Sequence, residues 1–169
     1  MSTSRQNKAF AATAKLTAAL ALALASACPA AAVSTPFEVV KGSWVGGGAL
    51  NFKDGHSEKL SCNAYYTSST DGKALTTALR CSGPSGKVEL RSHLNYASGK
   101  VSGGWEERTY NASGDASGIL NPGNLRLNFH GGVSGSMRVA FSASSQTVSI
   151  SISTSDVPVK QMNINFKRG

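Results

Sequence analysis

The sequence has few acidic residues and lacks long apolar segments, and these absences exclude several classes of protein. It has 9 acidic residues against 17 lysines and arginines, a formal net charge of +8. The basic residues are spread along the chain, whereas a nucleic-acid-binding surface is normally marked by a basic cluster. Beyond residue 32, no apolar segment approaches the roughly 20 residues that a membrane-spanning helix needs. We therefore expect no nucleic-acid partner and no transmembrane segment.

Histidine and cysteine are also scarce, at three residues of each type. His56, His93 and His130 show none of the short spacings that mark metal-binding motifs, so we expect no metal ion and no cofactor. The Gly-x-Ser-x-Gly motif of a nucleophilic serine is absent as well. These patterns assign no catalytic residue, and we predict that the protein is not an enzyme.

Residues 1–32 show the layout of a secretory signal peptide. A basic start without an acid is followed by a leucine- and alanine-rich run over residues 16–27 and then by small residues. The run is too short to span a membrane. Cleavage after Ala32 or after Ala27 fits the small-residue pattern, and the first removes Cys28 from the mature chain. We predict export to the periplasm, or secretion, from a bacterial cell, with residues 33–169 forming one domain.

The two remaining cysteines lie on either side of a predicted hairpin. Asp71-Gly72 favours a two-residue type I′ turn, and a chain that reverses there places Cys62 opposite Cys81. The two would occupy a hydrogen-bonded pair with Cα atoms about 5.5 Å apart, which is within disulfide range. Because an exported protein folds in an oxidising compartment, we predict a disulfide that contributes roughly 3 kcal/mol.

Apolar and polar residues alternate along most of residues 33–169, which favours β-strands over helices. Further turns are expected at Pro84-Ser85, Ser98-Gly99, Pro122-Gly123 and Ser144-Ser145. The last of these would place Phe141 opposite Val148. We predict an all-β fold, an antiparallel up-and-down meander of about 8–10 strands. Closure into a barrel would bury its single apolar face and remove both open edges; a two-sheet β-sandwich is the alternative.

The turn at Ser98-Gly99 also positions charged residues. It places two opposite-charge pairs on the outer face, which favours this register: Arg91 with Glu106, and Glu89 with Arg108. The same register turns Glu107 toward the apolar face, where a lone carboxylate is costly unless it is paired. We expect Glu107 to orient a ligand at a barrel mouth or to pair with a basic side chain such as Arg168. The alternative is a strand end at which this position is wet.

Two short segments at the ends of the predicted domain resemble the calycin superfamily, which contains lipocalins, fatty-acid-binding proteins and avidins. Gly42-Ser43-Trp44 opens the first strand, and Lys167-Arg168 closes the last. In calycin barrels, a Gly-x-Trp near the first strand packs under a basic residue from the end of the barrel. The resemblance implies that Trp44 forms the floor and that Arg168 or Lys167 stacks on it, an interaction worth roughly 1 kcal/mol.

Most of the domain also resembles a set of small exported proteins of unknown function from alphaproteobacteria. The similar segments are residues 42–48, the pair Cys62 and Cys81, and residues 102–107. This resemblance implies no activity. The barrel inhibitors of bacterial metalloproteases are a further parallel, because they are small and exported and have one disulfide and a tryptophan near the start.

The predicted interior is aliphatic and aromatic almost throughout, and Tyr66 and Trp105 face it. A ligand inside such a barrel would be lipophilic. We predict a non-enzymatic protein that binds a small lipophilic molecule or a cell-envelope component, with Glu107, Trp105 and Tyr66 as candidate ligand-binding residues. The alternative is a protein-interaction or protease-inhibitor-like module with a filled core. An interior cavity of roughly 300 Å³ or more would distinguish the first from the second.

Overall fold

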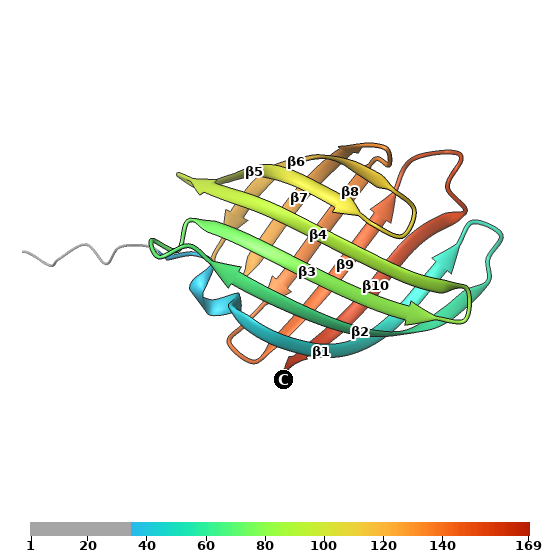
Figure 1. Cartoon of the computed structure of the whole chain (residues 1–169), viewed down its shortest axis with the longest axis horizontal. Helices are drawn as coiled ribbons and strands as arrows, with labels where there is room; N and C mark the ends of the chain where they lie inside the picture. The colour runs from blue at the N-terminus through green and yellow to red at the C-terminus, as the bar shows by residue number, and fades with distance from the viewer. Residues whose placement is uncertain (1–34) are drawn as a thin grey trace, which may run out of the picture. The chain divides into compact units, whose positions relative to one another are not determined.

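The structure is a computed structural model that describes residues 35–169. This part of the chain forms ten strands and one short 3-10 helix, η1 (Glu38–Val40), as Figure 1 shows. The strands are β1 (Gly42–Phe52), β2 (Ser57–Ser68), β3 (Ala74–Gly83), β4 (Gly86–Ala97), β5 (Lys100–Glu107), β6 (Ala112–Asn121), β7 (Asn124–Gly131), β8 (Gly135–Phe141), β9 (Ser145–Ile152) and β10 (Val159–Arg168). The predicted signal peptide and its cleavage sites lie outside the described residues.

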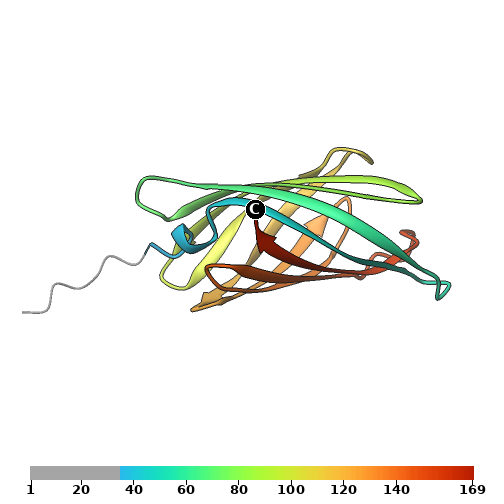
Figure 2. The same cartoon turned by 90° about the horizontal axis from the view of Figure 1, so that it is seen from below.

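The ten strands form a closed barrel. Each strand pairs antiparallel with the next, and β10 pairs with β1, so the sheet closes on itself. The strands wrap around one interior, as the two views in Figure 1 and Figure 2 show. The predicted up-and-down barrel is confirmed, and the two-sheet sandwich is wrong. Closure gives every strand two partners and leaves no open edge.

Alternation along each strand separates the interior of the barrel from its surface. On β2, four alternate positions are buried and the residues between them are exposed. The buried residues of this strand are Leu60, Cys62, Ala64 and Tyr66. Burying a large apolar side chain contributes about 1.5–3 kcal/mol. Burial of this apolar face is therefore the main favourable contribution to the stability of the sheet. Within residues 35–169, no helix is long and apolar enough to cross a membrane.

Glycines of strand β1 lie against the backbone of β10 where the two strands join. A Cβ atom built on Gly48 would lie 1.8 Å from the Asn163 carbonyl oxygen, and one on Gly46 would lie 2.1 Å from that of Asn165. Any side chain at these positions would therefore collide with the backbone of β10. The glycines of β1 allow the first and last strands to meet.

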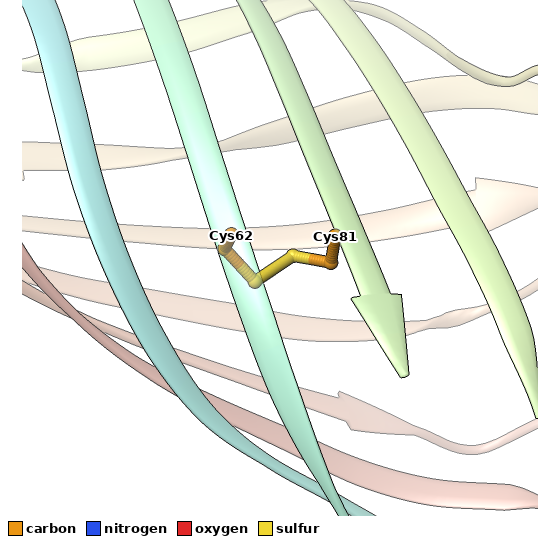
Figure 3. The surroundings of a disulfide bond; sticks show 2 residues. All are labelled: Cys62 and Cys81. Carbon is orange, nitrogen blue, oxygen red and sulfur yellow. A yellow bond between two sulfur atoms is a disulfide. The ribbon is translucent and has the colours of Figure 1, made fainter. Parts of the chain in front are cut away.

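The Cys62–Cys81 disulfide is present and joins β2 to β3 (Figure 3). Its register is the predicted one, but the turn is not type I′. Such a turn needs positive φ at both central residues, and of the two only Gly72 has it, at 68°. The Ser69 N–H instead donates to the Ala74 carbonyl around a longer loop. This shifts the bonded pairs by one residue, so the cysteines form a non-hydrogen-bonded pair with Cα atoms 4.1 Å apart, closer than predicted.

The hairpin between β8 and β9 departs from the predicted register by two residues. Phe141 pairs with Gln146 rather than with Val148. The reversal comes one residue earlier than predicted because Ser142 organises it: its N–H donates to the Ser145 carbonyl, and its hydroxyl oxygen accepts from the Ser145 N–H at 3.1 Å. A shift of two residues keeps every side chain on its own face, so the apolar side of the sheet is unchanged.

Glu89 forms ion pairs with three arginines on the outer face of the barrel. Its Oε1 lies 3.2 Å from Arg91 Nη2, 3.4 Å from Arg80 Nη2 and 3.7 Å from Arg108 Nη1. The predicted pairing of Glu89 with Arg108 is therefore present. Arg91 is opposite Glu106 in the sheet, as predicted, but turns to Glu89 instead. These groups are partly or largely exposed, so each ion pair contributes at most about 1 kcal/mol.

Trp44 and η1 close one end of the barrel. Trp44 is fully buried, and its indole N–H donates to the Val40 carbonyl at 2.7 Å. The Arg168 guanidinium lies over the indole, with Cζ 4.5 Å from the ring centroid. Of the two basic residues that the calycin resemblance offered, Arg168 is the one that stacks. Its guanidinium also donates to three backbone carbonyls, those of Ala143 (2.6 Å), Lys41 (2.7 Å) and Val39 (2.8 Å).

Candidate functional site

A cavity of about 580 Å³ occupies the interior of the barrel. Its lining is almost wholly apolar and includes Leu60, Leu79, Leu127, Val139, Val148 and Ile150. A barrel of ten strands is wider than one of eight, whose side chains just fill the interior, so the inward side chains leave space between them. The cavity exceeds the roughly 300 Å³ that separates a ligand site from a filled core.

The cavity opens at one end of the barrel and is closed at the other. At the open end, it is lined by residues of the β3–β4 and β5–β6 loops, including Ser85 and Tyr110. These loops lie toward the right in Figure 1. Tyr110 is 69% exposed there. At the opposite end, Phe37 and Val40 line the floor and are only 2% and 4% exposed. A ligand would therefore enter from the end that carries these loops.

One wall of the cavity carries a row of polar side chains that crosses four neighbouring strands. Tyr66, Thr77, Ser92 and Trp105 are successive register partners on β2, β3, β4 and β5, and all four line the cavity. We call these four residues the polar row. The Thr77 and Ser92 hydroxyls are hydrogen-bonded to each other at 2.8 Å. The Trp105 indole N–H is buried without a hydrogen-bond partner in the described part of the chain, and its ring packs edge-on against Phe129.

Tyr66 is the most buried member of the polar row, and burial raises the pKa of its phenol to about 12. An unperturbed tyrosine ionises near pH 10. The stabilisation that depends on the neutral phenol is therefore complete below about pH 10 and is lost as the pH rises through the pKa of the folded protein.

We predict that a tyrosinate absorbance titration of the wild-type protein contains a component near pH 12 that Tyr66→Phe lacks. Its cause is the desolvation of the ionised phenolate inside the barrel. Tyr96→Phe is the matched control, because Tyr96 is half-buried but does not line the cavity, and it should keep that component. Identical alkaline titration curves for wild type and Tyr66→Phe would contradict the placement of this phenol.

Glu107 faces inward at the mouth of the cavity, as the register predicts. Its carboxylate accepts three backbone N–H groups, from Glu89 at 2.8 Å, Thr109 at 3.1 Å and Tyr110 at 2.7 Å. These bonds fix the β5–β6 loop and satisfy the acid without a basic partner. The predicted pairing with Arg168 is wrong, because Arg168 lies at the closed end over Trp44. A contact between Glu107 and a ligand stays a prediction.

Three acidic side chains line the mouth of the cavity. Its acidic lining residues are Glu58, Glu107 and Asp156, and within residues 35–169 no lysine, arginine or histidine lines the cavity. The Ser85 hydroxyl and backbone N–H both donate to the Glu58 carboxylate, and these bonds, the hydroxyl first, lower the pKa of Glu58. The carboxylate is therefore ionised at neutral pH, where it disfavours an anionic ligand.

Several polar residues of the cavity were not singled out from the sequence, among them Thr77, Ser92 and Gln146. Thr77 and Ser92 could have been found by following the predicted register inward from Tyr66 and Trp105. Gln146 is 2% exposed, and its side-chain N–H₂ lacks a hydrogen-bond partner within the described residues. It continues the inward alternation of β9. The described residues contain no group of three or more His, Cys, Asp or Glu that could hold a metal ion.

Comparison with known proteins identifies the fold but not the activity. No protein-family model and no curated protein matches the sequence. Among solved structures, the barrel is similar to Rv2717c from M. tuberculosis, with a TM-score of 0.64 and 13% identity over 78% of this chain and 94% of that one. The S-type phycobiliprotein lyase CPES from Guillardia theta gives a TM-score of 0.48 at 11% identity, over 78% and 88% of the two chains. Likeness at this identity shows the barrel fold alone.

Proposed function

We propose that this protein is a non-enzymatic barrel that binds a small lipophilic molecule in its interior. The observation that carries the proposal is the cavity of about 580 Å³, open at one end and lined by aliphatic and aromatic side chains. This volume falls within the range of roughly 300–1,000 Å³ that is usual for small-molecule sites. The alternative, a protein-interaction module with a filled core, would not contain such a cavity.

The energetics of the interior also favour a ligand. Protein interiors are normally close-packed, and side chains that line an empty space lose the dispersion contacts that a neighbour would supply. A lipophilic molecule restores these contacts and removes its own apolar surface from water. We also propose that the protein acts after export, since the disulfide requires an oxidising compartment.

Filling the cavity should abolish or weaken ligand binding. We predict that the neutral fluorophore Nile red binds the wild-type protein saturably and that Thr77→Trp/Ser92→Trp binds it at least ~10-fold more weakly. The two indole rings would occupy the space above the polar row. Fluorescence titration measures both affinities, and circular dichroism establishes that the variant is folded.

The matched control is Thr76→Trp/His93→Trp. These two residues form the neighbouring register pair of the same strands, and both are exposed. They receive the same two rings on the outside of the barrel, so Nile red affinity should not change. Absence of saturable binding to the wild type, or equal weakening in both double variants, would reject an interior site. If the inward double variant fails to fold, Thr77→Trp alone should give a smaller loss.

A further inference from the structure

The polar row gives the cavity two chemically different walls. Strands β3 and β8 lie on opposite sides of the ring of ten strands. The polar row crosses β2 to β5, whereas the facing strands β7 to β9 line the cavity with apolar side chains such as Leu127, Met137 and Ile150. The exception is Gln146, at the start of β9. A ligand that fits both walls has an apolar body and a polar group on one edge.

The polar row is short of hydrogen-bond acceptors. The Tyr66 side chain is more than nine-tenths buried, and its hydroxyl, which lines the cavity, has no hydrogen-bond partner among the described residues. The Thr77–Ser92 pair uses one of its two hydroxyl protons in the mutual bond and leaves the other to donate. The Trp105 N–H is a further unpaired donor. A buried polar group without a partner is costly, and a ligand acceptor placed against the row would supply one.

Charge restricts what this acceptor can be. The cavity is lined by three acids, Glu58, Glu107 and Asp156, and by no basic side chain within residues 35–169. A carboxylate inside would be a buried anion without a counter-charge, which is strongly unfavourable, and it would pass these acids on entry. A ketone, ester, amide or ether oxygen accepts the same hydrogen bonds without either penalty.

We propose that the ligand is an uncharged lipophilic molecule with a hydrogen-bond acceptor, which the Tyr66 hydroxyl and the Thr77–Ser92 pair bind on one wall of the barrel. This inference rests on the proposed function and specifies its ligand class. The barrel would thus exclude fatty-acid anions and orient an ester- or ketone-containing molecule with its oxygen toward β2–β4.

Three ligands of matched shape test this inference: 2-acetylnaphthalene has a neutral acceptor, 2-ethylnaphthalene has none, and 2-naphthoate is an anion. Each is used to displace Nile red from wild type, Tyr66→Phe and the control Tyr96→Phe. Tyr66→Phe should weaken 2-acetylnaphthalene about fivefold, the effect of one neutral hydrogen bond, and leave 2-ethylnaphthalene unchanged. Tyr96→Phe should change neither. The wild type should bind 2-naphthoate more than ~10-fold more weakly than the ketone at neutral pH.

The outcomes separate this inference from the proposal beneath it. The inference is overturned, and the lipophilic site remains supported, if Nile red binds but Tyr66→Phe changes the affinities for the ketone and the hydrocarbon equally. The same holds if the wild type binds 2-naphthoate as tightly as the ketone. If neither Nile red nor any of the three ligands binds the wild type, the proposed function fails, and this inference fails with it.

Discussion

Trp44→Ala is expected to lower the free energy of unfolding by about 4 kcal/mol, the typical loss when a fully buried tryptophan is truncated. The indole has no exposed surface, donates to the Val40 carbonyl and lies under the Arg168 guanidinium. Truncation would therefore remove packing, a hydrogen bond and a cation–π contact at once. Urea unfolding of the oxidised protein, with equal denaturant slopes for both proteins, measures the loss.

Val45→Ala is the matched control for Trp44→Ala. Val45 is the next residue of β1, faces outward and is 54% exposed, so its truncation should change stability by less than about 0.5 kcal/mol. A loss of under about 1 kcal/mol for Trp44→Ala would be far below the usual range for a buried tryptophan. That result would show that Trp44 does not form the closed end of the barrel in solution.

Removal of the disulfide has the second-largest expected effect. Cys62→Ala/Cys81→Ala should lower the free energy of unfolding by about 3 kcal/mol, because the bridge restricts a loop in the unfolded chain. The two cysteines are 19 residues apart in the sequence. Neither lines the cavity, so the affinity of the folded double variant for Nile red should equal that of the wild type. Urea unfolding and fluorescence titration test the two statements separately.

Chemical reduction provides an internal control for this prediction. A reductant should destabilise the wild-type protein about as much as the double substitution does and should leave the double variant unchanged. A loss below about 1 kcal/mol would mean that the bridge adds little to the hairpin register that already aligns β2 and β3. Weaker Nile red binding by the folded variant would instead mean that the bridge shapes the cavity.

The sequence predicted the barrel because its registers depend on local turn chemistry. Gly72 and Gly123 adopt positive φ in their turns and set the register on either side. The β8–β9 turn has no such residue. Its register is set by hydrogen bonds of Ser142, and a run of serines does not indicate which serine will form them. The predicted type of the β2–β3 turn was also wrong. The same Asp71-Gly72 pair fits a two-residue turn and a longer loop, so the sequence does not distinguish the two.

The site was less predictable than the fold. The register placed Tyr66, Trp105 and Glu107 on the inner face, where the structure has them. It did not show that backbone N–H groups satisfy Glu107, because such groups carry no sequence signal. Nor did it decide between a cavity and a filled core, since the width of a barrel depends on strand number and tilt, which alternation does not specify.

The join between β1 and β10 also affects how the protein folds. At this join, Arg168 donates to the carbonyl of Lys41, a residue 127 positions earlier. All the other strand pairings join strands that are consecutive in the chain. The hairpins can form one after another, but the pairing of β1 with β10 requires that β10 is already in place. Because this contact is distant in sequence, we expect it to form more slowly than the hairpins. Until then β1 is an unpaired edge, which can pair with another chain. We therefore expect that loss of β10 would leave β1 and β9 as open edges, which favour aggregation over a smaller barrel.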